Sequence, residues 1–497
     1  MNTTLLMIGA LQAVTIIVGL LKGKALSIIL GPAQFGVMST IDQVVVVLIS
    51  LGSLSLPFTA TKFMSRSHSI GAERFEATTA SFLRALAFLS VLTAAAGLLA
   101  VGLEPQFLGS DLLPHTGVLR LAILGLPPAV MHALVINTFA AAQRPIAAAC
   151  VGFGLALVLA IAAIGGVSMN GLVGLYAGTS IVAFLALIVN VSYMSHSTGV
   201  RIFGPHTDIL SELRENSDVI SHAAYIYVAQ ATIAMAMLVS RYVVLSRLGA
   251  TSVGLLQSSL SIALTVGAVL APMSAFYLMP LVNRQMEGVR KINAANTFAS
   301  KMLLLLFCGG LPVVLFPGLL VTILFSHAFA GAAATLFVFV VWQLIFQVAN
   351  IYQQVLIGLD DVGFMSISAT TGFGVAAGLM YFLVPMLGLG GVGVGLATGM
   401  LLYGVAGAIR LDRRHGLSVS RAVAFRAVLV CGVLLAAGLL FGVRSELTLP
   451  GMSLRIGYAV TVTGMLWLSL GSGERAVITD ARSKVGAMWR ARGARME

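Results

Sequence analysis

Fourteen stretches of about 20 mostly apolar residues follow one another along the chain, and each is long enough to cross the hydrocarbon core of a bilayer as a helix. Of the 497 residues, 59% are hydrophobic and only 9% are charged, whereas soluble domains carry roughly 25% charged residues. The sequence therefore predicts an all-α integral membrane protein with about 14 transmembrane helices. The predicted spans are 5–30, 35–63, 77–103, 117–142, 145–165, 171–195, 219–247, 253–283, 295–325, 332–357, 363–385, 389–410, 421–443 and 452–472.

The net charge of +12 comes from short loops and the C-terminal tail, where cations set membrane topology and contact anionic headgroups, so no nucleic-acid partner is predicted. Most of these cations fall on one side, which places both termini in the cytoplasm. Lys62, Arg66 and Arg284 on that side are predicted to ring the cytoplasmic mouth, although topology alone also explains them. The acidic pair Asp360-Asp361 is interpreted as solvated.

Motifs of catalytic chemistry are missing from the sequence. It contains no phosphate-binding loop, no zinc-protease motif, no paired cysteines and no serine-nucleophile motif. No loop is long enough to form a catalytic domain outside the bilayer. We therefore expect transport without chemistry on the substrate, no metal and no cofactor apart from a coupling proton or Na⁺.

Short glycine motifs indicate that the first twelve spans arose by duplication. Because six spans return the chain to the same side, the two lobes are predicted to be parallel, with a pseudo-twofold axis along the membrane normal and the substrate site between them. Three motif pairs recur at a nearly constant offset along the chain: 30–36 (LGPAQFG) with 248–254 (LGATSVG), 152–154 (GFG) with 372–374 (GFG), and 171–174 (GLVG) with 390–393 (GGVG). The predicted organisation is an N-terminal six-helix lobe (1–195), a cytoplasmic linker (196–218), a C-terminal six-helix lobe (219–410), two additional transmembrane helices (421–472) and a basic cytoplasmic tail (473–497).

Four charged residues lie inside predicted spans at a similar depth: Lys22 and Lys24 in the first span, Asp42 in the second and Arg241 in the seventh. Each costs about 2.5–3.5 kcal/mol near the centre of a membrane helix on insertion scales. We therefore expect the three cations to line a water-filled cavity that receives an anion. Alternatively, the lysines extend to the membrane interface and Arg241 and Asp42 form structural ion pairs. Asp42 either neutralises a lysine or binds a coupling proton or Na⁺.

The tenth span carries a stripe of amide side chains at steps of four, three and four residues, which is one face of a helix. The stripe consists of Gln343, Gln347, Asn350 and Gln354. Amides offer both hydrogen-bond donors and acceptors, which suits sugar hydroxyls. The sequence therefore predicts that this face contacts a sugar.

Two segments resemble polysaccharide transport proteins, the Wzx-type oligosaccharide flippases, whose superfamily also includes the multidrug and toxin extrusion transporters. KGKALSIILGPAQFG (22–36) is similar to that family's first span and turn, and SRYVVLSRLGATSVGLLQSSLSIA (240–263) is similar to its seventh and eighth spans. The resemblance covers most of residues 1–410 and implies a V-shaped pair of six-helix lobes with two further helices. Related peptidoglycan-precursor flippases carry an arginine-rich first span, where this chain has lysines, and multidrug members typically have twelve spans.

The function that this resemblance implies is translocation of a polyprenyl-pyrophosphate-linked oligosaccharide from the cytoplasmic to the periplasmic leaflet of the bacterial inner membrane, for exopolysaccharide or O-antigen biosynthesis. The family's cavity cations correspond to Lys22, Lys24 and Arg241, which would bind the pyrophosphate. Partners would be membrane lipids and the polysaccharide polymerase and export machinery. Two alternatives are a cation-coupled exporter of small amphipathic molecules, which depends on Asp42, and a membrane polysaccharide polymerase or ligase.

Overall fold

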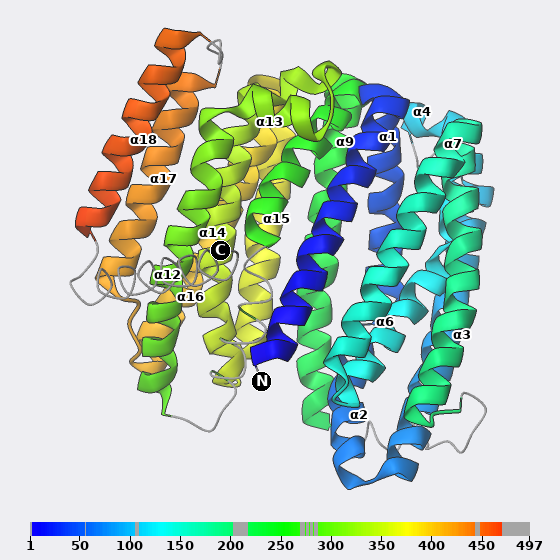
Figure 1. The fold of residues 1–497 in the computed structure, drawn as a ribbon. Coiled ribbons are helices and arrows are strands. Elements are labelled where there is room, and N and C mark those ends of the chain that lie inside the picture. The colour runs from blue at the N-terminus through cyan, green and yellow to red at the C-terminus, as the bar shows by residue number, and fades with distance from the viewer. Residues whose placement is uncertain are drawn as a thin grey trace, which may run out of the picture.

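The computed structural model describes residues 2–54, 56–104, 109–201, 217–268, 287–442 and 448–469, with positions 274, 278 and 282. These residues are almost entirely helical (Figure 1). Most of the predicted linker and the tail beyond residue 469 lie outside them. The elements are α1 (Asn2–Gly52), α2 (Leu56–Ile70), α3 (Ala72–Leu103), α4 (Gly109–Leu112), η2 (Leu113–His115), α5 (Thr116–Leu124), α6 (Leu126–Ala141), α7 (Pro145–Thr198), α9 (Ser217–Ala268), α12 (Gly288–Leu315), α13 (Pro317–Leu324), η4 (His327–Thr335), α14 (Leu336–Gly358), α15 (Val362–Leu387), α16 (Leu389–His415), α17 (Arg421–Phe441) and α18 (Leu449–Ser469).

Three of the long helices each consist of two membrane-crossing segments joined at a glycine. The breaks are at Gly31 in α1 (φ 66°), Gly171 in α7 (φ 53°) and Gly249 in α9 (φ 81°), a left-handed conformation that glycine adopts without steric cost. In α7 a Cβ on Gly166 would lie 2.2 Å from the carbonyl oxygen of Gly174, whereas eight residues of straight helix span about 12 Å. The chain therefore turns back on itself at these glycines.

Among the described residues, ten helices are long and apolar enough to cross a membrane, and three of them are the broken helices, so thirteen segments result when the halves are counted separately. The helix α18, which corresponds to the fourteenth predicted span, has 21 residues but is not among these ten. Prolines divide the second, fourth and ninth predicted spans into shorter helices, at Pro57, Pro127 and Pro317. Each stands in the first turn of the new helix, where the missing N–H has no partner to lose.

The helices form two lobes side by side, which confirms the predicted fold class (Figure 1). In the N-terminal lobe α6 packs against α2, α3 and α7, and α1 packs against α7. In the C-terminal lobe α15 and α14 pack against α16, and α15 against α9. The lobes meet where α1 contacts α9. The additional helix α17 packs on α12 and α14, with α18 outside it, at the edge of the C-terminal lobe farthest from the N-terminal lobe.

An internal repeat is visible in the backbone of the two lobes. Gly31 of α1 and Gly249 of α9 have ψ angles of 174° and 171° at φ 66° and 81°. Gly171 and Gly388, at nearly the same offset along the chain, share a second break, with φ of 53° and 57° and ψ of −139° and −137°. Corresponding loops of the two lobes therefore use the same glycine conformations.

Two of the three predicted motif pairs are out of register. The motif at 171–174 corresponds to residues 388–391, which contain the matching backbone break, and not to 390–393. The two GFG motifs are also displaced, because Gly152 is the eighth residue of α7 whereas Gly372 is the eleventh of α15. The chain contains 53 glycines, so short glycine motifs also match by chance.

Candidate functional site

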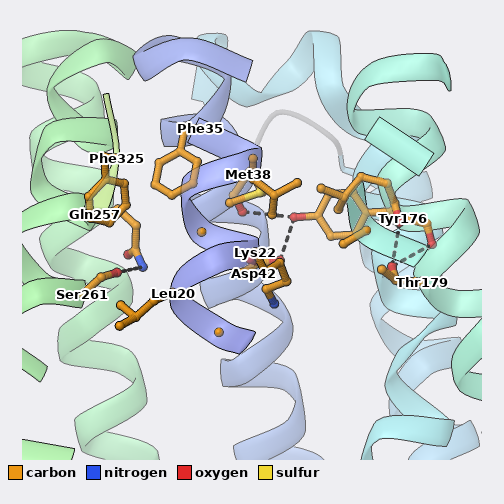
Figure 2. A pocket seen from close by; sticks show the side chains of 15 residues that line it. Leu20, Lys22, Phe35, Met38, Asp42, Tyr176, Thr179, Gln257, Ser261 and Phe325 are labelled. Atoms are coloured by element: carbon orange, nitrogen blue, oxygen red, sulfur yellow. Dashed lines mark hydrogen bonds between the residues drawn. The ribbon is translucent and has the colours of Figure 1, made fainter. Parts of the chain in front are cut away.

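A cavity of about 280 Å³ lies beside α1, between the two lobes (Figure 2). Its lining comes from α1 and α7 of the N-terminal lobe and from α9 and Phe325, next to α13, of the C-terminal lobe. Apolar residues such as Leu20, Phe35 and Met38 form much of the surface. The polar lining residues are Lys22, Asp42, Tyr176, Thr179, Gln257 and Ser261. Because both lobes contribute, a movement of one lobe against the other changes the shape of the cavity.

Asp42 provides the only carboxylate that lines this cavity within the described part of the chain. It is exposed to the cavity from the second half of α1. The hydroxyl group of Tyr176 on α7 lies 2.7 Å from Asp42 Oδ1, to which it donates, and 3.1 Å from the carbonyl oxygen of Met38 (Figure 2). Lys22, from the first half of α1, faces the same space, and its charge acts on Asp42. The carboxylate is thus held in place beside an ammonium group.

Arg241 does not line the cavity but lies buried behind it, with 7% of its surface exposed. Its Nε donates to Ser39 Oγ (2.9 Å), and its two terminal nitrogens donate to the carbonyl oxygen of Met237 (2.9 Å) and to Gln257 Oε1 (2.6 Å). Ser39 Oγ in turn donates to Gln257 Oε1 (2.9 Å). Because Ser39 belongs to α1 and Gln257 to α9, this guanidinium joins the two lobes.

Lys24 also contacts the opposite lobe and not the cavity. Its ammonium group donates to the carbonyl oxygen of Ile323 in α13. Near it, Phe35 of α1 meets the rings of Phe325 and Phe329 edge-on, with centroids 5.9 and 5.5 Å apart. These contacts join the lobes at the end predicted to be extracellular. The structure therefore separates the three predicted pyrophosphate ligands, and only Lys22 reaches the cavity.

Two residues of the amide stripe, Gln343 and Gln347, pack against α9, and none of its four residues lines the cavity. A Cβ on Gly267 would lie 1.9 Å from Gln343 Nε2 and 2.6 Å from Gln347 Nε2. Gln343 is only 2% exposed, so it lies within the packing of the C-terminal lobe and not against water, contrary to prediction. Asn350 and Gln354 are half-buried.

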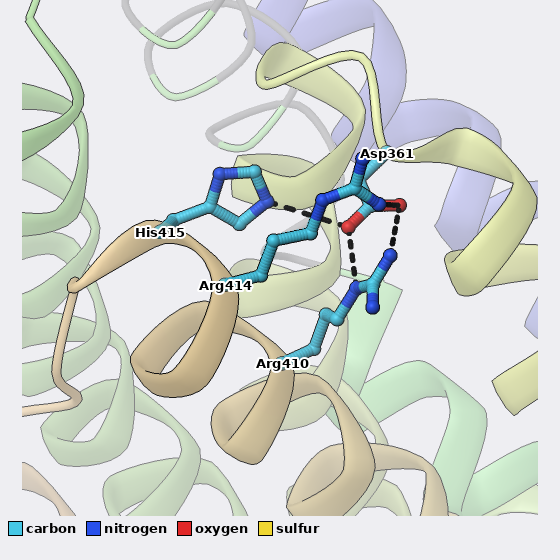
Figure 3. Close-up of polar contacts among 4 residues, drawn as sticks. All are labelled: Asp361, Arg410, Arg414 and His415. Carbon is cyan, nitrogen blue, oxygen red and sulfur yellow. Dashed lines mark hydrogen bonds and ion pairs between the residues drawn. The ribbon is translucent and has the colours of Figure 1, made fainter.

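The predicted cytoplasmic mouth is only partly described. Arg66 is exposed, while the side chain of Lys62 and residue Arg284 lie outside the described residues. At the same end of the C-terminal lobe, Asp361 is only 8% exposed and pairs with the last turns of α16 (Figure 3). Arg410 Nε lies 2.7 Å, Arg414 3.2 Å and His415 3.3 Å from its carboxylate oxygens.

The interpretation of this acidic pair as solvated is therefore wrong for Asp361. Its cationic partners lie 49 to 54 residues further along the chain, so only the packing of α16 beside the turn after α14 reveals them. The hydrogen bond from Arg410 holds the pKa of Asp361 below its usual value, with further lowering from His415 and Arg414. The cluster thus stabilises the end of the C-terminal lobe that is predicted to be cytoplasmic.

Sequence analysis missed Tyr176, Gln257 and Ser261. Gln257 could have been found, because it follows Ser39 by the repeat offset of 218 residues, so two polar residues occupy equivalent positions next to the lobe interface. Nothing in the sequence around Tyr176 distinguishes it from a tyrosine buried in the protein core.

Comparisons with known proteins bear on the fold. No protein-family model matches the sequence, and no curated protein matches it. Solved structures do match: an inward-facing multidrug resistance MATE family transporter of the MOP superfamily has a TM-score of 0.60 and 18% identity, with 82% of this chain and 94% of that chain covered. A MATE protein in complex with MaD3S has a TM-score of 0.58 and 17% identity, with 83% of this chain and 96% of that chain covered. A ligand complex of the MATE multidrug transporter DinF-BH has a TM-score of 0.57 and 17% identity, with 83% of this chain and 94% of that chain covered.

The chain is therefore a multi-pass membrane protein with the transporter fold of the MATE proteins. This agrees with the superfamily that the sequence resemblance indicated. The matched structures cover about five-sixths of the chain.

Proposed function

We propose that this protein is a secondary transporter that exports small amphipathic molecules by alternating access, driven by a cation that binds at Asp42. The observation that carries the proposal is the position of Asp42 in a cavity between the lobes, with Tyr176 bonded to one oxygen and Lys22 nearby. The cavity surface is about half apolar and half polar, which suits an amphipathic molecule. The fold shared with MATE transporters agrees with this function.

Coupling follows from the charge of the cavity. Binding of a proton or Na⁺ at Asp42 removes one negative charge from a space that also contains Lys22. Charges interact strongly where water is scarce, so this change alters the relative free energy of the two lobe arrangements. Tyr176 belongs to α7 and Asp42 to α1, so a bound cation also changes contacts within the N-terminal lobe. Rocking of the lobes then exposes the cavity to one side and to the other.

The test is transport in proteoliposomes under an imposed pH or Na⁺ gradient. Two amphipathic dyes of opposite charge, a cationic rhodamine ester and anilinonaphthalenesulfonate, serve as probes. We expect the wild type to move at least one of them in a gradient-dependent way and Asp42→Asn to abolish that dependence. Asp111→Asn makes the same chemical change at an exposed residue in α4 and is the control. Gradient-driven transport by Asp42→Asn would refute the proposal.

The second candidate is the flippase of polyprenyl-pyrophosphate-linked oligosaccharides in the bacterial inner membrane. One observation favours it: Lys22 faces the cavity. This candidate predicts that a fluorescent farnesyl-pyrophosphate-linked sugar changes leaflet in proteoliposomes and that Lys22→Met stops it. A polymerase or ligase would instead join glycans in detergent, without a sealed membrane.

A further inference from the structure

The orientation of the Gln257 amide is determined by its neighbours. A guanidinium nitrogen only donates hydrogen bonds, so the Gln257 atom 2.6 Å from Arg241 is the oxygen Oε1. The same oxygen accepts a second hydrogen bond from Ser39 Oγ at 2.9 Å. The nitrogen Nε2 consequently faces the other way, 3.2 Å from Ser261 Oγ, and both Gln257 and Ser261 line the cavity (Figure 2). Arg241 therefore determines that the amide nitrogen of Gln257, and not its oxygen, faces the cavity.

The wall that α9 contributes to the cavity consequently presents hydrogen-bond donors. Gln257 Nε2 uses one N–H for Ser261 Oγ and keeps a second. Ser261 Oγ accepts that bond, so its own proton is available to donate, and none of the described residues accepts it. Lys22 adds an ammonium group from α1 that forms no hydrogen bond or ion pair within the described part of the chain. The strongest acceptor in the cavity, Asp42, already receives the Tyr176 hydroxyl.

The charged residues in and behind the cavity also favour an anionic ligand. The three hydrogen-bond partners of Arg241 are all neutral, so none of them balances its positive charge. Within the part of the chain that the structure describes, Asp42 is the one carboxylate near both Lys22 and Arg241, and it leaves a net charge of +1 on these three residues. A bound anion removes this excess while Asp42 remains ionised. The anion therefore binds to the donor groups of the cavity, whereas the coupling cation binds to Asp42.

We propose that the headgroup of the transported amphipath is an oxyanion, a carboxylate or phosphate group, bound by Gln257 and Ser261 on one lobe and by Lys22 on the other. Arg241 is a positioning residue that orients Gln257 without touching the substrate. This inference rests on the proposed transport function and names the substrate class of that same cavity. Since the donors belong to both lobes, the bound headgroup bridges α1 and α9, and the apolar chain lies against residues such as Leu20 and Phe35.

The experiment measures binding of three probes to the full-length protein in detergent by calorimetry: farnesyl phosphate, inorganic phosphate and farnesyl trimethylammonium. We expect farnesyl phosphate to bind at least about tenfold more tightly than the cationic probe, since hydrogen bonds to charged groups are strong. Comparable binding of inorganic phosphate would identify a free oxyanion, and its absence a lipid headgroup; both support an oxyanion site. Equal affinity for the two farnesyl probes would overturn the proposal.

The decisive variant is Gln257→Glu. A glutamate keeps an oxygen toward Arg241 and Ser39, which preserves folding, but replaces the cavity-facing N–H donors by an anionic oxygen. We expect affinity for farnesyl phosphate to fall at least about tenfold, and affinity for the cationic probe to rise. Ser261→Ala removes one hydrogen-bond donor, so it should lower the affinity for farnesyl phosphate and leave the affinity for the cationic probe unchanged. An unchanged preference in Gln257→Glu would refute the assignment.

The role of Arg241 is tested by charge selectivity and not by stability. Arg241→Met lets the Gln257 amide rotate and should reduce the anion preference by about tenfold, while Arg241→Lys, which still donates to Oε1, should restore most of it. Arg247→Met is the control, because it removes a cation of α9 that stacks on Tyr381, away from the cavity. If selectivity falls equally in Arg247→Met, Arg241 has no positioning role.

The same assays separate this inference from the proposed function. Asp42→Asn should retain the preference for farnesyl phosphate while losing gradient-driven transport. If wild type shows the anion preference but no coupling to a gradient, only the proposed function fails. If it shows coupling but prefers the cationic probe, only the oxyanion assignment fails.

Discussion

Gly36 and Gly254, which occupy equivalent positions in the internal repeat, contact each other's lobe through the same backbone atoms. A Cβ on Gly36 would lie 2.1 Å from the carbonyl oxygen of Ala250, and a Cβ on Gly254 would lie 2.0 Å from the carbonyl oxygen of Pro32. Pro32 and Ala250 are also equivalent in the repeat, so the contact is reciprocal about the pseudo-twofold axis. The lobes meet here backbone to backbone, which only glycine permits.

Gly36→Ala should therefore separate the lobes at the end predicted to be extracellular. An added methyl group in such a tight contact costs about 1–3 kcal/mol, which shifts a two-state equilibrium by about five- to 150-fold. The measurement is a spin-label distance between Met169→Cys and Arg247→Cys, at that end of the two lobes, after the native cysteines have been replaced. We expect a population at longer distance.

The matched control for Gly36→Ala is Gly154→Ala, because, apart from the neighbouring turns of its own helix, nothing lies within 4 Å of the position its Cβ would occupy. This variant should reproduce the wild-type distances. Identical distance distributions in both variants would mean that the Gly36 contact does not decide how closely the lobes approach.

Tyr176→Phe should weaken cation coupling without removing the carboxylate. The lost hydrogen bond to Asp42 spans 2.7 Å, and hydrogen bonds to charged groups contribute about 1.5–3 kcal/mol, so we expect at least a tenfold weaker dependence on the driving cation. The measurement is the initial rate of dye transport as a function of pH or Na⁺ gradient. Tyr193→Phe, on the same helix and half exposed, should behave like wild type. Equal behaviour of the two variants would remove Tyr176 from the coupling site.

Gly267→Ala should destabilise the C-terminal lobe because the new methyl group meets the amide of Gln343 at 1.9 Å. Overpacking of this kind costs about 1–3 kcal/mol. Gln343→Ala in the same chain should recover part of the loss, since it removes the nearer of the two amides that the methyl group meets, the other being Gln347 at 2.6 Å. The measurement is a double-mutant cycle of melting temperatures in detergent. Additive effects of the two substitutions would show that the residues are not coupled.

Stability should depend on pH through Asp361. Because its pKa in the folded protein lies below the usual value, the cluster with Arg410 stabilises the fold above the ordinary aspartate pKa of about 3.9 and loses this effect as the pH falls through the lowered value. Asp361→Asn should lower the melting temperature by a few degrees at pH 7, with a shrinking difference on acidification. Glu76→Gln is the control, since its partner Arg201 has 73% of its side chain exposed and the pair is screened. If the melting temperatures of wild type and Asp361→Asn differed by the same amount at all pH values, the ionised Asp361 carboxylate would not be the source of this stability.

The charged residues of the candidate site could be predicted because the bilayer penalises charge. Lys22, Lys24, Asp42 and Arg241 stand out in apolar segments for that reason alone. The groups that these four side chains contact could not be predicted from the sequence. Lys22 and Lys24 are two residues apart, which is about 200° around a helix, so one faces the cavity and the other the carbonyl oxygen of Ile323. A single sequence does not show which face of the first span meets which neighbour.

The sequence by itself determined the class of protein, most of its membrane segments and the existence of two related lobes, since hydrophobic length and glycine breaks are local properties of the chain. Only the tertiary structure decided that Arg241 bonds Ser39 and Gln257 behind the cavity and that Asp361 lies among cations from α16. The physical reason is distance along the chain. Hydrogen bonds and ion pairs between residues tens or hundreds of positions apart depend on how whole helices pack, and no local pattern records that packing.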